Sequence, residues 1–260
     1  MLLFGKSDIG LVRTSNQDCF SLNEFPDGRC FAVVCDGMGG YSGGNIASDI
    51  AVRVINDELA EKLSSPISDI EVRDCITNAI CLANDKIYES AQMDSSISDM
   101  GTTAVVVYIT GNILFVAHVG DSRAYLFHDG ALSRITKDHS LVQSLIDSHS
   151  ITEEEALVHP YRNIITRVVG REAAPDVTFS SHVFNPGDIA VLCTDGLTNM
   201  VNETELASLL SDVDVINEDV CSELIDIANA NGGKDNITVV LLGGMSENTL
   251  FPNEGPAEEN

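Results

Sequence analysis

Basic residues are scarce in this sequence, and their scarcity excludes one large class of function. Of the 260 residues, 14 are lysine or arginine and 40 are aspartate or glutamate, so the formal net charge is −26. Proteins that hold nucleic acid or anionic lipid through their general surface need clustered lysine and arginine. We therefore expect neither nucleic acid nor a membrane as a partner. The excess of acid leaves two interpretations open, a solvated acidic surface or carboxylates gathered to hold cations.

Long hydrophobic runs are missing as well. The longest apolar stretches, such as residues 104–109, have the length of a strand and fall far short of the ~20 residues that cross a bilayer. The apolar run at residues 1–6 is too short for a signal peptide, and Asp8 follows it. We expect a soluble protein located in the cytoplasm.

Several patterns of cysteine and histidine chemistry are also absent. The seven cysteines include no CxxC pair and no phosphate-binding CxxxxxR loop, and the six histidines include no HExxH pair. These absences argue against a disulfide framework, a zinc ribbon, a catalytic cysteine and a zinc protease site. Cys35 and Cys193 lie in apolar runs and are interpreted as buried, reduced thiols.

What is present is a succession of helix and strand patterns. Periodicity predicts helices over 45–63, about 72–87, 203–210 and about 215–230, and a partly helical stretch over 139–170 with a capping box at Thr152-x-x-Glu155. Apolar runs between glycine-containing turns predict strands over 31–35, 102–109, 113–119, 123–128, 131–135, 177–184, 189–194 and 237–242. Two helices lie early, two lie late, and most strands lie between them. This order favours an α+β fold of two stacked antiparallel β-sheets flanked by α-helices on both faces.

Neither a repeat nor an interdomain linker interrupts residues 1–244, so we expect one domain there. Residues 245–260 carry Pro252, Pro256 and several glutamates without periodicity, which predicts a disordered acidic tail.

The positions of certain aspartates are the most informative feature. Apolar strands are followed closely by Asp36, Asp121 and Asp195, each beside a glycine, while Asp18 and Asp235 stand just before strands. If these strand ends converge, the carboxylates form a nest of hard oxygen ligands that suits Mg²⁺ or Mn²⁺. The alternative is that each aspartate simply starts a turn, as Asp-Gly often does.

Arg13 lies close to Asp18 in a chain with few basic residues. It fits a guanidinium that holds a phosphate with two parallel hydrogen bonds. A surface ion pair is an equally good interpretation from spacing alone.

Together these residues resemble a known family, the metal-dependent serine/threonine protein phosphatases of type 2C in their compact bacterial form. The motifs follow the family's order from about residue 7 to 242, so the resemblance covers nearly the whole chain. Each motif is weak alone, and the specificity comes from eight of them in order. They are Arg13-x-x-Asn16-x-Asp18, Asp36-Gly37-Met38-Gly39-Gly40, Gly101-Thr102-Thr103, Gly120-Asp121-Ser122-Arg123, Asp138-His139, His159-Pro160-x-x-Asn163-x-x-Thr166-Arg167-x-x-Gly170, Asp195-Gly196 and Asp235-Asn236-x-Thr238.

The resemblance implies a centre of two Mn²⁺ or Mg²⁺ ions. By motif, Asp36 would bridge both ions, Asp18 and the carbonyl of Gly37 would bind one, and Asp195 and Asp235 would bind the other.

Further roles follow from the same resemblance. Asp121 with Asp195 corresponds to a third, weaker metal site, Arg13 to the phosphate-binding arginine, and residues 139–170 to a flap beside the active site. The implied reaction is hydrolysis of phosphoserine and phosphothreonine in proteins by a water shared between two metals, reversing a Ser/Thr kinase. The implied partners are phosphorylated proteins, among them a kinase and its substrates, and we expect a monomer.

The proton donor is the point at which this sequence departs from the family. Relatives carry a histidine at the position of either Met38 or Tyr41. The leaving alkoxide could instead take its proton from a metal-bound water, from Tyr41 or from His139. Two other functions stay open, a pseudophosphatase that binds phosphoproteins without turnover and a hydrolase of small phosphate esters.

Overall fold

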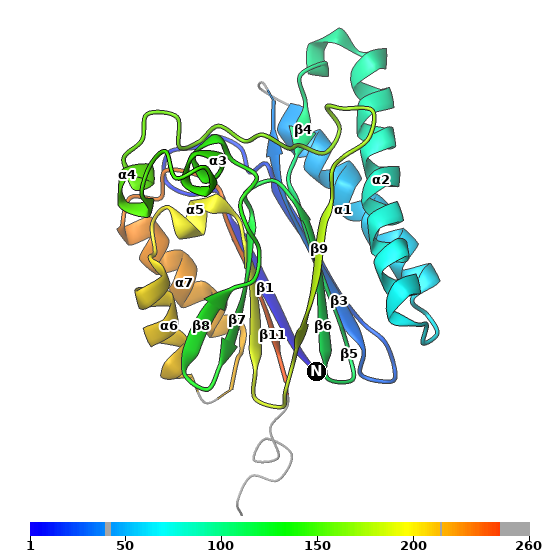
Figure 1. Ribbon diagram of the computed structural model, residues 1–260, viewed down its shortest axis with the longest axis vertical. Coiled ribbons are helices and arrows are strands. Elements are labelled where there is room, and N and C mark those ends of the chain that lie inside the picture. Colours follow the sequence, from blue (N-terminus) through cyan, green and yellow to red (C-terminus); the bar gives the residue numbers. More distant parts are fainter. Residues whose placement is uncertain (40–42, 214, 245–260) are drawn as a thin grey trace, which may run out of the picture.

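A computed structural model describes residues 1–39, 43–213 and 215–244 of the chain. Its strands form two sheets stacked face to face, with helices on both outer sides (Figure 1). All the strand pairings described are antiparallel. The predicted fold class is confirmed.

The first sheet has the order β1-β11-β10-β7-β8. Its strands are β1 (Leu2–Asp8), β11 (Ile237–Gly243), β10 (Ile189–Cys193), β7 (Arg123–His128) and β8 (Ala131–Arg134). On its outer face lie α5 (Asp195–Thr198), α6 (Glu203–Ser211) and α7 (Glu218–Ala230).

The second sheet has the order β2-β3-β5-β6-β9, with the short β4 paired to β3. Its strands are β2 (Asp18–Glu24), β3 (Cys30–Met38), β4 (Gly101–Thr102), β5 (Ala104–Thr110), β6 (Ile113–Val119) and β9 (Thr178–Val183). The long helices α1 (Gly43–Lys62) and α2 (Asp69–Met93) cover its outer face, and the 3₁₀ turn η1 (Ser95–Ile97) follows α2 (Figure 1).

Continuous apolar strands arise because both faces of each sheet are covered. Along β3, Phe31 and Val33 pack towards α1 and α2, whereas Ala32 and Val34 pack between the sheets. A strand alternates its side chains between two faces, so a strand buried on both sides must be apolar at every position. The core is therefore three layers of side chains, one between the sheets and one under the helices on each outer face.

Two local predictions differ from the structure. The last helix begins at Glu218 rather than near 215, because the side chain of Asn217 caps it by accepting a hydrogen bond from the backbone N–H of Val220. Strand β1 has no predicted counterpart. It is an edge strand, and its pairing with β11 fixes a conformation that its sequence pattern does not indicate.

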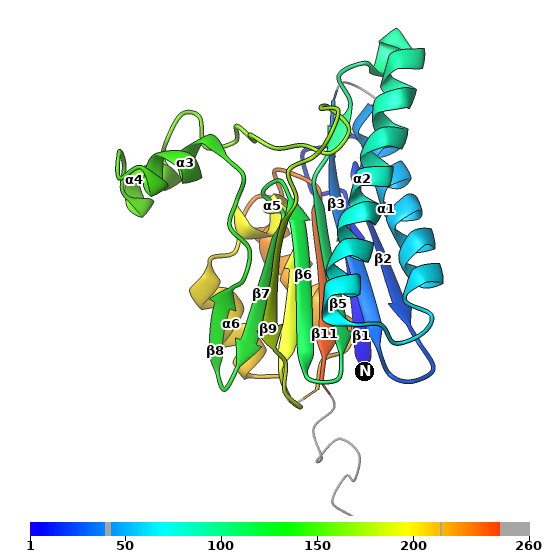
Figure 2. The same ribbon diagram turned by 45° about the vertical axis from the view of Figure 1, so that its right-hand side comes forward.

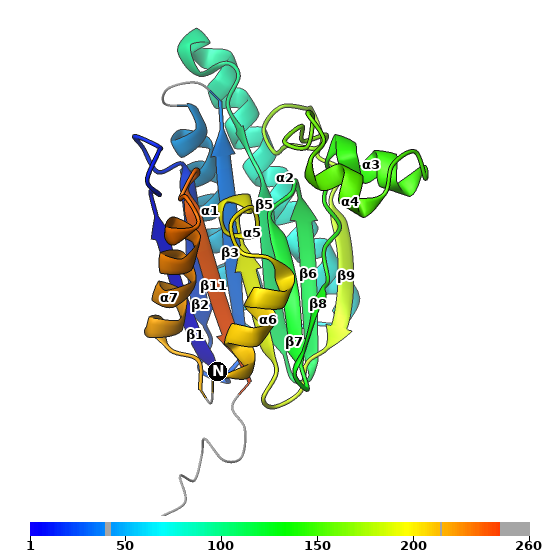
Figure 3. The same cartoon turned by 90° about the vertical axis from the view of Figure 1, so that its left-hand side faces the viewer.

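Residues 139–170 form a segment that projects from the body of the molecule (Figures 2 and 3). It contains α3 (Leu141–Asp147) and α4 (Glu153–Leu157), and the capping box of Thr152 and Glu155 is present as predicted. Its two ends are tied together, since the N–H of Leu141 donates to the carbonyl of Ile164 and the N–H of Thr166 to that of His139.

Within the part of the chain described, no helix combines the length and apolar character needed to cross a membrane. The predicted tail, 245–260, and Tyr41 lie outside the described residues.

Candidate metal centre

The predicted aspartates are brought to one end of the stacked sheets by the antiparallel topology. Asp18 opens β2, Asp121 follows β6, Asp195 follows β10 and opens α5, and Asp235 precedes β11. Asp36 lies on β3, directly opposite Asp18 in the register. Since neighbouring strands run in opposite directions, the starts of β2 and β11 lie at the same end as the ends of β6 and β10.

One detail of this pattern is corrected by the structure. The sequence predicts that the strand ends at Cys35, but β3 continues to Met38 because Gly37 and Met38 pair with β4. Asp36 is therefore held inside a paired strand. Its N–H donates to the hydroxyl of Thr103, and its carbonyl accepts from the N–H of the same residue at 2.8 Å.

Asp36 has the least favourable setting for a bare carboxylate. Burial raises its pKa well above the ordinary value, and the nearby Asp18, Asp195, Asp121 and Asp235 raise it further. A half-buried anion beside four others is costly unless a cation compensates its charge.

Asp18 shares this setting but has partial hydrogen bonding. Its Oδ2 accepts from the hydroxyls of Thr194 (2.8 Å) and Thr238 (2.7 Å), while its buried Oδ1 has no hydrogen-bond partner among the described residues. Burial raises its pKa to about 7 despite these two bonds. Asp18 Oδ1 is therefore a buried oxygen whose lone pairs could bind a cation.

Asp121 and Asp195 form the other side of the group. Burial, then Asp195 and Asp138, raise the pKa of Asp121 to about 8, and its buried Oδ1 also has no partner within the described part of the chain. Burial and then Asp235 raise the pKa of Asp195 to about 6. Asn199 partly offsets this by donating to Asp195 Oδ2 at 3.0 Å.

Asp235 is the most accessible of the five, and Arg13 pairs with it. The guanidinium Nη2 lies 2.7 Å from Asp235 Oδ2, and the Arg13 side chain is 48% exposed. Of the two interpretations of Arg13, the ion pair is therefore present in the structure. It also places the guanidinium at the edge of the carboxylate group, within reach of an anion bound there.

The loop that carries Arg13 is fixed by one side chain from the opposite end of the sequence. Asn236 donates to the carbonyls of Ile9 (2.9 Å) and Ser15 (3.0 Å) and accepts from the N–H of Gln17. Residues 9–17 are thus tied to the start of β11, beside Asp235.

The glycines next to the aspartates are required by close backbone contacts. A Cβ on Gly37 would lie 2.0 Å from the carbonyl oxygen of Gly44, and one on Gly196 would lie 1.9 Å from that of Asn236. No larger residue fits at either place without moving the backbone. The Asp-Gly pattern therefore reflects packing around the carboxylates as well as turn formation.

The residues present fit a centre of divalent ions. Hard carboxylate oxygens are the ligands that Mn²⁺ and Mg²⁺ prefer, and two of those here are buried with no partner in the part of the chain that the structure describes. Among the described residues, no three acidic, histidine or cysteine side chains already converge as one ligand set. Asp18 Oδ2 accepts hydrogen bonds from two hydroxyls, and Asp235 Oδ2 pairs with Arg13, so these two oxygens have partners within the fold.

His139, a candidate proton donor, is committed to the fold. Its Nδ1 accepts from the N–H of Gly120 at 3.1 Å, and its Nε2 lies 2.9 Å from the hydroxyl of Thr178. Burial, followed by His118 and Arg167, lowers its pKa to about 3, so it is neutral near pH 7. This geometry argues against His139 as the donor.

Sequence reasoning did not assign roles to Thr194 and Asn199. Thr194 precedes Asp195 and binds Asp18 instead, and Asn199 is one helical turn after the carboxylate to which it donates. The i, i+4 spacing of Asp195 and Asn199 is a signal that could have shown the second contact.

Comparison with known proteins agrees with the motifs. Residues 11–223 match the family described as Protein phosphatase 2C. The chain belongs to this family. The family predicted from the motifs is confirmed, and with it the enzyme class, a protein serine/threonine phosphatase.

Similar proteins match over nearly their whole length. The serine/threonine phosphatase stp of Listeria monocytogenes is 36% identical over 237 residues, covering 91% of this chain and 93% of that protein. The serine/threonine phosphatase structure from S. agalactiae has 38% identity and a TM-score of 0.87, covering 94% of this chain and 99% of that one. The catalytic domain of the phosphatase PstP, solved with two manganese ions, has 33% identity and a TM-score of 0.79, covering 92% of this chain and 96% of that one.

Proposed function

We propose that this phosphatase hydrolyses phosphoserine and phosphothreonine in proteins with a water activated at a centre of two divalent metal ions, and thereby reverses a Ser/Thr kinase. The observation that carries the proposal is the group of five aspartates at one end of the sheets, four of them with raised pKa values. The relatives that match over most of the chain are named serine/threonine phosphatases, which supports the substrate class.

Each residue of the site has a proposed role. Asp36 is central and would contact both ions, Asp18 and the Gly37 carbonyl would hold one, and Asp195 and Asp235 the other. Bound ions would lower the pKa of a water and offset the charge of the phosphoryl group. Asp121 with Asp195 would provide a third, weaker position.

Arg13 is proposed to orient the substrate. If Asp235 bound a cation in place of Arg13, the guanidinium would be free to donate two hydrogen bonds to a phosphate. Asn236 keeps its loop in place, so the arginine stays at the edge of the centre.

We also propose a cytoplasmic location and a monomeric state. All seven cysteines are free, which suits a reducing compartment. Phosphorylated proteins, among them a kinase and its substrates, are the proposed partners.

The test is a metal-dependence curve on phosphoserine, phosphothreonine and phosphotyrosine peptides, with Mn²⁺ and Mg²⁺ compared. We expect phosphate release from the first two peptides, loss of activity with EDTA, and recovery when metal is restored. The matched variant is Asp36→Asn, which keeps the shape of the side chain and removes its charge. Full activity in EDTA or in this variant would contradict the metal mechanism, and a clear preference for phosphotyrosine or small esters would contradict the substrate class.

A further inference from the structure

The positive charge of Arg123 lies near Asp121 and Asp195, two of the candidate metal ligands. It lies two residues after Asp121, at the start of β7, and its charge acts on both Asp121 and Asp195. A guanidinium so close to two carboxylates could pair with them and would repel a divalent cation between them. The Arg13–Asp235 pair at the other side of the site shows that such pairing occurs here.

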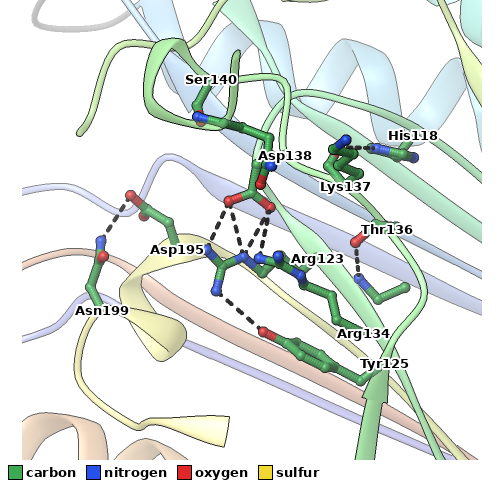
Figure 4. Close-up of polar contacts among 12 residues, drawn as sticks. His118, Arg123, Tyr125, Arg134, Thr136, Lys137, Asp138, Ser140, Asp195 and Asn199 are labelled. Atoms are coloured by element: carbon green, nitrogen blue, oxygen red, sulfur yellow. Dashed lines mark hydrogen bonds and ion pairs between the residues drawn. The ribbon is translucent and has the colours of Figure 1, made fainter. Parts of the chain in front are cut away.

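Among the described residues, the side-chain hydrogen bonds of Arg123 go to Asp138 and Tyr125 and not to these carboxylates. Arg123 Nε donates to Asp138 Oδ1 (3.0 Å) and Oδ2 (3.2 Å), and Nη2 donates to Oδ2 at 2.7 Å (Figure 4). The remaining Nη1 donates to the hydroxyl of Tyr125 at 3.3 Å. This geometry uses three of the donor groups of Arg123, and the Asp138 side chain is only 11% exposed.

Asp138 is itself placed by the chain around it. On one side, the carbonyl of Lys137 lies 2.8 Å from His118 Nε2, which donates to it. On the other, the N–H of His139 donates to the carbonyl of Gly120 at 2.9 Å. These bonds attach the segment leading into residues 139–170 to the turn that carries Asp121, so the Asp138 carboxylate is fixed relative to that turn.

The Asp121 carboxylate keeps one oxygen that is not paired with Arg123. Across residues 1–39, 43–213 and 215–244, one buried oxygen of this carboxylate finds no hydrogen-bond partner, although an arginine lies two residues away. Arg134 also pairs with Asp138, since its Nη1 lies 3.7 Å from Asp138 Oδ1. Asp138 thus pairs with two arginines, Arg123 and Arg134.

We propose that Asp138 is a positioning residue that binds and neutralises Arg123, so that Asp121 and Asp195 remain available to a divalent cation. The inference rests on the proposed metal-dependent function but concerns a different property, the affinity of the Asp121/Asp195 position for the ion. In the proposed role, Asp138 contacts neither the substrate nor the ion. It acts through Arg123.

The test is Mn²⁺ binding measured by titration calorimetry on the full chain, with wild type, Asp138→Asn, Arg123→Gln and the double variant. Asp138→Asn frees the arginine charge, and we expect Mn²⁺ at the weaker position to bind about tenfold less tightly. Arg123→Gln removes the competing charge, and binding there should be as tight as in wild type or tighter. The double variant should return to within about threefold of wild type.

The opposite signs distinguish this role from a structural one. If the pair only stabilised the fold, both single variants would weaken binding and the double variant would not recover it, and that result would overturn the inference. So would unchanged Mn²⁺ affinity in Asp138→Asn.

A second comparison keeps the test decisive if Asp138→Asn does not fold. Arg123→Lys retains the charge and Arg123→Gln removes it, so the glutamine variant should bind Mn²⁺ more tightly than the lysine variant. Equal affinities would contradict the inference. Phosphopeptide hydrolysis by the wild type is measured in parallel. Its absence would refute the proposed function, while the affinity comparison would still be interpretable.

Discussion

At the scale of single residues, the site is built from charges that the fold alone does not compensate. Asp36 is half-buried among four other carboxylates, and burial, followed by the charges of Asp18, Asp195, Asp121 and Asp235, raises its pKa. Arg13 and Arg123 each approach the group but are bound by Asp235 and Asp138 respectively. Without metal, the carboxylates therefore repel one another, and bound cations would offset this repulsion.

This repulsion leads to a prediction for Asp36→Asn. In EDTA near neutral pH the variant should melt at a higher temperature than wild type, because the amide keeps the shape without the charge. Each unit by which the pKa of Asp36 is raised corresponds to about 1.4 kcal/mol in the free energy of unfolding. For a chain of this size, 1 kcal/mol changes the melting temperature by about 2–4 °C. Mn²⁺ should raise the melting temperature of wild type strongly and that of the variant little. A lower melting temperature of the variant in EDTA, measured by calorimetry, would contradict this account.

At the scale of elements, the loop of Arg13 depends on an anchor at the start of β11. Asn236→Ala removes three hydrogen bonds to residues 9–17 and leaves their backbone groups without that partner. We expect a loss of about 2–4 kcal/mol in the free energy of unfolding. KM for a phosphopeptide should rise more than kcat falls, because the arginine that orients phosphate is displaced.

The control for this variant is a cap far from the site. Ser68→Ala removes the capping box of α2 and should cost about 1 kcal/mol without changing KM. If both variants change KM equally, the loss reflects general destabilisation and not the loop.

The end of β7 carries a pH-sensitive contact. His128 Nδ1 lies 2.6 Å from the buried Asp188 Oδ1, and the exposed Asp129 lies 3.4 Å from Nε2. The hydrogen bond to Asp188, helped by both carboxylate charges, raises the pKa of His128 above its ordinary value. A histidine with a raised pKa stabilises the fold when protonated, and that contribution is lost as the pH rises through its folded-state pKa.

We therefore expect His128→Gln to lower the melting temperature at about pH 5.5 and to have a much smaller effect at about pH 8.5. Melting curves of both proteins across this range, with EDTA present throughout, measure the difference. A difference that is constant with pH would show that His128 contributes packing alone.

At the scale of the whole molecule, the net charge of −26 acts against compactness. Acidic side chains spread over the surface repel one another, and salt screens that repulsion over a Debye length of about 10 Å at 0.1 M. Raising NaCl from about 10 mM to about 0.3 M in EDTA should increase the melting temperature by a few degrees. A decrease would indicate that surface ion pairs outweigh the repulsion.

Much of this architecture could be predicted because it depends on local patterns. The apolar runs of β3, β5 and β11 and the stripes of α1 and α2 follow from burial on both sides of each sheet. The start of α7 and the edge strand β1 were missed because a cap and a pairing partner, rather than periodicity, decide them. Position beside glycine singled out the aspartates, since only glycine fits the close backbone contacts there.

The sequence by itself determined the covering of the sheets, the acidic character of the chain and the set of carboxylates able to bind ions. Only the tertiary structure decided that Asp18 lies opposite Asp36, that Arg13 pairs with Asp235, and that Arg123 pairs with Asp138. The reason is physical. Burial and periodicity are encoded over a few neighbouring residues, whereas the partner of a charge depends on which distant segments the antiparallel pairing brings to the same end of the sheets.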